Sequence, residues 1–315
     1  MIKERGSPEA ALEGLCYDSF WERDLDCALK EKISLLSFFD PHYPNSLKQL
    51  ADAPLILYVK GTLLASDSAS LGIVGTRQCS LYGQEMTGKI AQEIALAKLT
   101  VVSGLARGID TAAHLGALKT GRTLALIGSG LSHIYPRENK VLAERIAEQG
   151  AVISELSMHT PPERRHFPRR NRLVSALSQG VLLAEAPIKS GAMITMEMAH
   201  FQKKMCFSLP GRADSESFRG NHFLIKEKKA LLVENCADML SLLGYPNPSS
   251  VYSAADDLDL EEKELMTLLP SEEITIEELS LRTNLPIAKL SSLLMGLVLK
   301  QAVREFPGKF YKKVP

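Results

Sequence analysis

Short apolar runs alternate with amphipathic, helix-forming stretches through most of the chain. The runs carry β-branched residues and lack regular alternation with polar ones, which is typical of strands that are buried on both faces. Strands that alternate with helices in this way build a parallel sheet with helices on both sides. The pattern therefore predicts an α/β fold with a doubly wound, mostly parallel sheet. The predicted strands are LGIVG (71–75), LTVVSG (99–104), TLALIG (123–128), AVISE (151–155), GVLLAEA (180–186), MCFSLPG (205–211) and ALLVE (230–234).

The pattern differs at the N-terminus. Residues 1–38 are expected to be helical, and we interpret residues 1–39 as a helical appendage that packs on the sheet domain, itself assigned to 40–245. The run LILYVKG (55–61) is expected to add one strand at the edge of the sheet. The apolar series of the appendage is Leu25, Leu29, Ile33 and Leu36.

A polar segment rich in proline, serine and aspartate follows the sheet domain, and its composition predicts a linker over 246–257. Residues 258–315 then contain three helical stretches and two short strands around a Pro-Gly turn. This order is that of a winged helix-turn-helix domain. Its second helix is acidic but its wing is basic, so protein binding and DNA binding are equally open for this domain. The basic wing residues are Arg304, Lys309, Lys312 and Lys313.

The composition is that of a soluble globular protein. The chain has 315 residues, of which 45% are hydrophobic and 23% charged, and ~150 residues per domain suggests roughly two domains. No stretch approaches the ~20 apolar residues of a membrane-spanning helix, and the first residues lack the apolar core of a secretory signal. The cysteines are scattered, which is typical of reduced thiols in the cytoplasm. They are Cys16, Cys27, Cys79, Cys206 and Cys236.

The net charge is formally zero, because 37 basic residues balance 37 acidic ones. Proteins that bind nucleic acid usually carry a basic excess, so this balance argues mildly against such a partner. The loops after the predicted strands change the picture, because nearly all combine glycine or serine with arginine, lysine or a helix start. Small residues and helix N-termini suit phosphate groups. These loops therefore predict a site for a nucleotide or for a run of backbone phosphates.

The densest positive charge lies in TPPERRHFPRRNR (160–172). Five arginines surround one aromatic residue, Phe167, and the only acid in the segment is Glu163. Cations interleaved with an aromatic ring suit a single-stranded nucleic acid, whose bases stack while its phosphates pair. A solvated loop whose arginines pair with nearby carboxylates explains the composition equally well. The arginines are Arg164, Arg165, Arg169, Arg170 and Arg172.

Motifs for catalysis are weak. GQEMTGK (83–89) matches a phosphate-loop pattern by letter, but Ile90 replaces the hydroxyl residue that would hold magnesium. No dinucleotide-binding glycine pattern follows any strand. Glu155 and Glu185 follow predicted strands, and buried salt bridges are a better interpretation of them than sugar binding. We therefore expect no catalytic residue, no metal and no cofactor.

A series of motifs in order resembles the DNA-processing protein A family, called DprA or Smf, over about residues 40–240. The resemblance implies a Rossmann-like domain and also fits the polar linker and terminal winged helix. In the last strand unit Lys229-Ala230 replaces the usual Gly-Ala, near the sheet edge where the family's dimer contact tends to form. The motifs are IVGTR, YG, SGLARGIDTAAH, GSGLSHIYPREN, SEL, FPRRNRLVSALS, EAPIKSGAMIT and PG.

The resemblance also implies a function. Family members bind single-stranded DNA in the pocket of these loops, form dimers through the Rossmann-like domain, protect incoming DNA and load the RecA recombinase during natural transformation, with no established catalytic activity. Carried over onto this chain, the residues implied in strand or phosphate binding are Gly75, Thr76, Arg77, Ser103, Gly104, Arg107, Gly108, Gly128, Arg164, Arg165, Phe167, Arg169, Arg170, Asn171, Arg172, Ser190, Gly191 and Thr195.

The alternative is a nucleotide-processing enzyme of the phosphoribohydrolase type. Such enzymes also build nucleotide pockets from Gly and Ser loops, and Thr195 with Glu197 could supply the acidic part. They normally carry a P-G-G-x-G-T-x-x-E run, which this sequence lacks. An adaptor whose winged helix binds a protein partner is a third possibility.

Overall fold

The computed structural model describes residues 20–245, 259–270, 272–300, 302–306 and 308–313. Contacts divide the chain into two compact units, and the boundary between them in the sequence lies between Leu243 and Gly244. The predicted linker 246–257 and residues 1–19 of the predicted appendage lie outside the described residues. None of the described helices combines the length and the apolar character that crossing a membrane requires.

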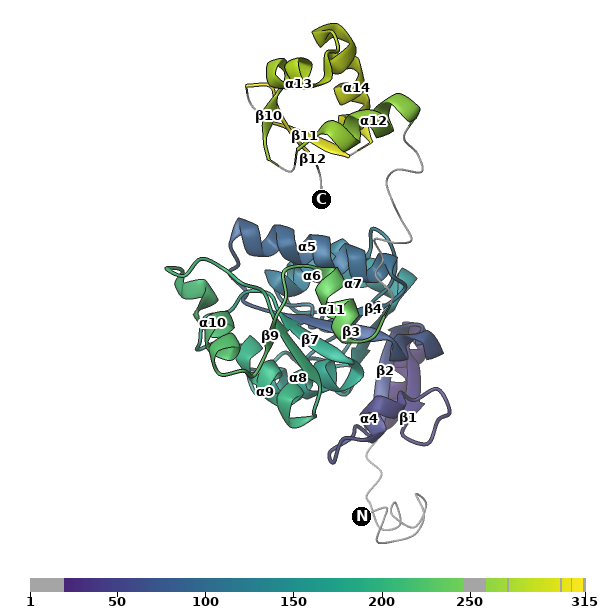
Figure 1. Cartoon of the computed structure of the whole chain (residues 1–315). Coiled ribbons are helices and arrows are strands. Elements are labelled where there is room, and N and C mark those ends of the chain that lie inside the picture. The colour runs from purple at the N-terminus through teal and green to yellow at the C-terminus, as the bar shows by residue number, and fades with distance from the viewer. Residues whose placement is uncertain (1–19, 246–258, 271, 301, 307, 314–315) are drawn as a thin grey trace. The chain divides into compact units, whose positions relative to one another are not determined.

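The first unit contains a sheet with the strand order β1-β2-β6-β5-β4-β3-β7-β8-β9. In this order, every pair of neighbours between β6 and β9 is parallel, whereas β1 pairs with β2 and β2 with β6 in antiparallel fashion. The predicted doubly wound, mostly parallel fold is therefore confirmed (Figure 1). The strands are β1 (Ser34–Ser37), β2 (Ile56–Gly61), β3 (Ser70–Val74), β4 (Thr100–Ser103), β5 (Thr123–Leu126), β6 (Ala151–Ser154), β7 (Gly180–Leu183), β8 (Met205–Ser208) and β9 (Leu231–Leu232).

Two predictions for the N-terminal region are wrong. The helix α3 (Phe20–Lys30) ends before residue 34, and residues 34–37 form β1 instead of continuing the helix. As a result, β2 is not the edge strand, because it lies between β1 and β6. Apolar residues at positions 33, 35 and 36 fit a strand as well as a helix, so their spacing alone could not decide between the two.

Helices cover both faces of the sheet (Figure 1). Leu124 and Leu126 point into one apolar core and Ala125 into the other, because successive residues of a strand face opposite sides. One core contains residues of α8 and α9 and the other residues of α7. The remaining helices of this unit are α4 (Asn45–Lys48), α5 (Leu81–Leu96), α6 (Ile109–Ala117), α7 (Lys140–Gln149), α8 (His166–Leu177), α9 (Gly191–Phe201), α10 (Arg219–Lys226) and α11 (Cys236–Leu242).

The second unit has its own apolar core, which includes Leu265, Leu279, Leu294 and Tyr311. Its sheet has the order β10-β12-β11 and is antiparallel. Three helices with a two-stranded hairpin confirm the predicted winged-helix fold. The elements are α12 (Leu260–Leu268), β10 (Ile274–Thr275), α13 (Ile276–Thr283), α14 (Ile287–Leu299), β11 (Val303–Phe306) and β12 (Phe310–Lys313).

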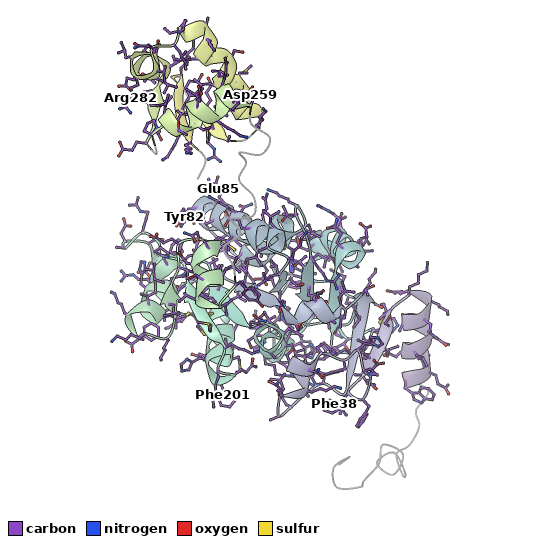
Figure 2. All side chains as sticks on the ribbon, turned by 45° about the vertical axis from the view of Figure 1, so that its right-hand side comes forward. Phe38, Tyr82, Glu85, Phe201, Asp259 and Arg282 are labelled. Carbon is purple, nitrogen blue, oxygen red and sulfur yellow. The ribbon has the colours of Figure 1, made fainter. Side chains whose placement is uncertain are left out.

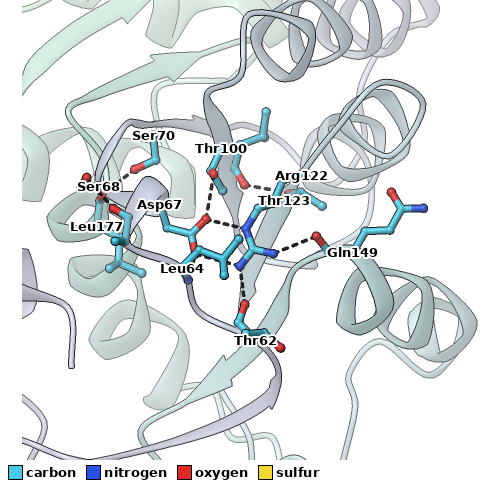
Figure 3. A network of polar contacts seen from close by, with 12 residues as sticks. Thr62, Leu64, Asp67, Ser68, Ser70, Thr100, Arg122, Thr123, Gln149 and Leu177 are labelled. Atoms are coloured by element: carbon cyan, nitrogen blue, oxygen red, sulfur yellow. Dashed lines mark hydrogen bonds and ion pairs between the residues drawn. The ribbon is translucent and has the colours of Figure 1, made fainter. Parts of the chain in front are cut away.

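A buried ion pair joins the amino ends of the strands in the first unit (Figure 3). Arg122 Nε lies 2.6 Å from Asp67 Oδ1, and Arg122 Nη2 donates to Asp67 Oδ2 at 2.8 Å. Asp67 also accepts hydrogen bonds from the hydroxyl of Thr100 at 2.9 Å and from the backbone of Leu64 at 2.8 Å. The carboxylate thus links the segment before β3 to the starts of β4 and β5.

We predict that Asp67→Asn lowers the free energy of unfolding of the first unit by about 2–4 kcal/mol, because it leaves the half-buried Arg122 without its countercharge. Trp21 is the only tryptophan and lies on α3, so its fluorescence during urea unfolding follows this unit. The control is Asp214→Asn, which removes an exposed partner of Arg212 and should leave the transition unchanged. Equal midpoints for the two variants would contradict the prediction.

Candidate functional site

A cavity lies at the point where the strand order of the sheet reverses. Consecutive strands run from β3 through β4 and β5 to β6 in one direction, and from β7 through β8 to β9 in the other. Loops that leave β3 and β7 therefore separate, and a crevice opens between them at the carboxyl ends of the strands. The cavity has a volume of about 910 Å³, and its lining comes from the loops after β3, β4, β5, β6 and β7 together with residues of α6, α8 and α9.

The loop after β3 and the loop after β4 are held against each other by backbone contacts. The backbone of Ile109 donates to the carbonyl of Thr76 at 3.2 Å. Gly108 has a φ of +72°, and a Cβ at this position would overlap the same carbonyl of Thr76. The turn therefore needs glycine. Gly75, Thr76 and Arg77 line the cavity, whereas Gly108 and the buried Ser103 support the loops from outside the lining.

The buried carboxylate of Glu185 fixes the loop after β3. Glu185 is fully buried and accepts from the backbone and hydroxyl of Ser80, at 3.0 and 2.8 Å from Oε2. Ser80 is the N-cap of α5, and its hydroxyl in turn accepts from the backbone of Gly83. The predicted salt bridge of Glu185 is wrong, because the described residues provide hydrogen-bond donors at a helix N-terminus in place of a cation. That partial positive charge favours the carboxylate.

An aromatic wall forms on one side of the cavity. Phe167 is half-buried in the first turn of α8, and the guanidinium carbon of Arg77 lies 5.2 Å from the centroid of its ring. The ring of Tyr135 lies 5.8 Å from the ring of Phe167. Gly128 is not in the lining but lies behind Phe167, because its Cβ would be 3.1 Å from Phe167 Cδ1. Tyr135 is a site residue that the sequence did not predict, because it stands inside the motif GSGLSHIYPREN without a signal of its own.

The arginine-rich segment divides between the cavity and nearby carboxylates. Arg164 and Arg170 line the cavity. Arg165 pairs with Glu163 at 2.7 Å and stays exposed. Some arginines of this segment therefore face the cavity and others pair with carboxylates, so each of the two interpretations that the sequence left open applies to part of the segment.

Glu155 holds the N-terminal part of α8 through ion pairs with Arg169 and Arg172. It lies 3.3 Å from Arg169 Nε and 2.5 Å from Arg172 Nη2, as expected for a buried salt bridge. Arg172 is buried outside the cavity lining, and its Nε also lies 2.9 Å from Asp52. Burial raises the pKa of Glu155, and Arg172 and Arg169 oppose that shift. The structure therefore places Arg172 in the support of the site, and it leaves Arg169 exposed at its margin.

Arg170 provides a fixed cation at the floor of the cavity. Its side chain is buried, donates to the carbonyl of Leu126, and occupies the space that a Cβ on Gly104 would fill. Burial lowers the pKa of Arg170 to about 10, and Asp110 opposes this shift. The guanidinium therefore remains protonated at neutral pH. Asp110 itself is buried, and desolvation raises its pKa while Arg170 lowers it.

The start of α9 forms the opposite wall. Ser190 is the N-cap of this helix, and its buried hydroxyl has no hydrogen-bond partner among the described residues. A Cβ on Gly191 would meet no atom within 4 Å, so the approach to the backbone is open. Asn171 donates to the carbonyl of Gly191 at 3.3 Å. Unpaired N–H groups at a helix N-terminus attract an anion, and the exposed Lys189, which sequence reasoning also missed, lies in the same lining.

The cavity is rich in cations and poor in acids. Arg77, Arg164, Arg170 and Lys189 line it, together with Arg107, which pairs with Glu138. Asp110 is the one carboxylate in the described lining. Thr195 lines the cavity, but Glu197 is exposed on α9 outside it, so the acidic part of the enzyme alternative is missing here. Within the described ranges no three metal-ligating side chains cluster.

Fold and site together define a Rossmann-like domain with a crevice lined by cations, joined in sequence to a winged-helix domain. Residues 34–244 match the family model described as DNA recombination-mediator protein A, and residues 250–309 match the DprA winged helix domain. The chain belongs to this family, as its sequence resemblance predicted.

Individual relatives agree with this assignment. The chain is 35% identical to Protein Smf of Escherichia coli over 86% of its own length and 75% of that protein. The DNA processing protein DprA of Streptococcus pneumoniae is 40% identical over 67% of this chain and 74% of the relative.

Two solved structures of family members are similar. The Streptococcus pneumoniae protein has a TM-score of 0.64 at 38% identity, covering 72% of this chain and 83% of the other. DNA processing protein A of Helicobacter pylori, whose single-stranded DNA binding mode its structure describes, has a TM-score of 0.62 at 32% identity. That match covers 68% of this chain and 98% of the other.

We predict that Glu185→Gln lowers the free energy of unfolding of the first unit by about 1–3 kcal/mol. The backbone N–H of Ser80 donates to both carboxylate oxygens, at 3.1 Å from Oε1 and 3.0 Å from Oε2, and an amide replaces one of these acceptors by an NH₂ donor. Urea unfolding followed by Trp21 fluorescence measures the loss. Glu197→Gln, the same change at an exposed position of α9, is the matched control and should have no effect. If both variants unfold together with the unmodified chain, Glu185 does not fix the loop.

Proposed function

We propose that the chain binds single-stranded DNA in the cavity between β3 and β7. The observation that carries this proposal is the combination of an aromatic wall, Phe167 with Tyr135, and the N-terminus of α9 across one cavity. Phosphates bind at the open N–H groups of α9 and at the cavity arginines. Unpaired bases stack on the aromatic wall, which suits a single strand because its bases are free to turn outward.

Further support comes from Arg170, whose positive charge is held in one position at the floor of the cavity. Arg170 is held by the carbonyl of Leu126 and by the packing against Gly104, so it loses little freedom when a phosphate binds. Arg77 lies over Phe167 in the structure without DNA. An incoming base takes the place of this guanidinium on the ring, and the guanidinium moves to a phosphate.

Membership of the family supports a proposal for the role in the cell. We propose a cytoplasmic, non-enzymatic protein that protects incoming single-stranded DNA and passes it to the RecA recombinase in natural transformation. The support is the family match over 34–244 and the single-strand binding described for the Helicobacter pylori relative. A cavity whose described lining contains one carboxylate, itself buried, suits binding better than acid–base catalysis.

We predict that Arg77→Ala and Phe167→Ala each weaken the binding of an oligothymidine by about 5–150-fold, which corresponds to the ~1–3 kcal/mol of one stacked base or charged contact. Fluorescence anisotropy at two salt concentrations measures the change, and Arg77→Ala should also reduce the salt dependence, because it removes a phosphate contact. The matched control is Arg145→Ala, which removes an exposed cation of α7 outside the lining.

The proposal fails if single-stranded and duplex DNA bind equally well and neither variant at the aromatic wall changes the affinity. Release of a free base from a nucleoside monophosphate, lost in Glu197→Gln, would favour the enzyme alternative instead.

We further propose that the chain forms a homodimer at the sheet edge around β9. The support is an exposed apolar edge: Leu231 and Leu232 are 46% and 50% exposed, and Phe223 of α10 is 39% exposed. Exposed apolar edge strands favour pairing with another chain.

We predict that Leu232→Lys converts a dimer to a monomer, because it places a charge in the apolar edge. The molar mass from light scattering after size-exclusion chromatography measures this change. Val141→Lys introduces a lysine in place of another exposed apolar side chain, on α7, and should leave the dimer intact. A monomeric unmodified chain, or a dimer in both variants, would contradict the edge assignment.

A further inference from the structure

The outer face of the wing in the second unit carries an unusual set of side chains. In the antiparallel pair of β11 and β12, Arg304 lies directly opposite Lys312, and Phe306 lies directly opposite Phe310. Residues directly opposite in such a pair share one face of the sheet. The other face contributes Val303 and Tyr311 to the apolar core of the unit. Two cations and two aromatic rings therefore share the face that points away from the core.

This arrangement is unfavourable for the wing alone. Like charges directly opposite each other on a sheet destabilise the pair. No acidic side chain among the described residues forms an ion pair with Arg304 or Lys312. Lys309, in the turn between the strands, adds a further exposed cation. A polyanion would relieve the repulsion between these groups.

The aromatic part of this face is accessible. Phe310 is 39% exposed, and its ring packs against the turn at Gly308, where a Cβ would lie 3.2 Å from two ring carbons. Gly308 has a φ of +90°, so the turn is one that favours glycine. Phe306 is half-buried on the same face. Flat rings beside paired cations offer stacking surfaces for bases next to sites for phosphates.

The helix that usually reads duplex DNA in a winged helix is poorly suited to it here. In α14, Lys289 pairs with Glu261 at 2.7 Å. The other exposed positions of this helix are apolar or small, and they offer neither a cation for a phosphate nor the long polar side chains that read base edges. The preceding helix α13 is acidic in its first turn. These positions are Ile287, Ala288, Ser291, Ser292 and Met295.

We propose that the outer face of the wing is a second binding site for single-stranded nucleic acid, in which Arg304 and Lys312 contact phosphates and Phe306 and Phe310 stack on bases. The site lies in a different unit from the cavity between β3 and β7 and does not depend on it. It assigns the winged helix a nucleic-acid partner and gives its sheet, not α14, the contact role.

The test uses the full chain carrying Arg77→Ala and Phe167→Ala, so that binding in the cavity is weakened and the wing contributes most of the remainder. In this chain we expect weak, salt-dependent binding of an oligothymidine. Adding Arg304→Gln and Lys312→Gln should reduce the slope of log K against log salt by about 1.4, since each phosphate contact to a single strand contributes about 0.7. Thermal stability should stay equal or rise, because like charges are removed.

A matched control separates this site from general charge effects. Lys263→Gln with Arg282→Gln removes the same charge from exposed positions of α12 and α13 (Arg282 is labelled in Figure 2) and should leave the slope unchanged. Phe310→Leu, which keeps an apolar side chain but removes the ring, should lower the affinity severalfold with no change in slope. Binding of a duplex of the same sequence should be unaffected by all of these changes.

The inference is overturned if the chain with the weakened cavity no longer binds single strands, if the wing pair and the control pair behave alike, or if the wing changes reduce duplex binding but not single-strand binding. The cavity proposal is judged separately, by comparing the chain carrying Arg77→Ala and Phe167→Ala with the unmodified chain. Equal affinity of these two would reject the cavity and leave the wing to be judged by its own variants.

Discussion

The cavity depends on the reversal of strand order between β3 and β7. Because the chain continues to one side after β3 and to the other after β7, their loops part at the carboxyl ends of the strands. The buried carboxylate of Glu185 then holds the first loop by its hydrogen bonds to Ser80. With that loop fixed, Arg77 lies over Phe167, and the N-terminus of α9 faces them across the cavity. The cations and rings that we assign to DNA binding thus depend on one topological feature and one buried anchor.

Positive charge is concentrated around the cavity although the chain as a whole is neutral. Formal net charge is zero because acidic side chains elsewhere balance the basic ones. Around the cavity, part of the positive charge is consumed by structure, as in the pairing of Arg172 with Glu155 and Asp52. Arg170 instead keeps a buried charge in the cavity lining. The local density of charge determines the electrostatic field at a site, whereas the net charge of the whole chain does not.

The sequence predicted the sheet well because strands buried on both faces form apolar runs that are easy to see, such as TLALIG and GVLLAEA. It failed at residues 34–37, where a short run fits a helix and a strand equally. It could not decide which arginines face the cavity, since that depends on the carboxylates of Asp52 and Glu155, which lie far apart in the sequence. Tyr135 was missed for the same reason: its contact with Phe167 exists only in the folded chain.

The central claim is that single-stranded DNA lies across the aromatic wall of the cavity, and photo-crosslinking tests it most directly. An oligonucleotide containing 5-iodouracil is irradiated with the full chain, and the attached peptides are identified by mass spectrometry. We expect crosslinks at Phe167 or Tyr135, and we expect unlabelled single strands, but not duplex, to compete for them. Crosslinks that avoid both residues, or that duplex removes equally well, would contradict the account.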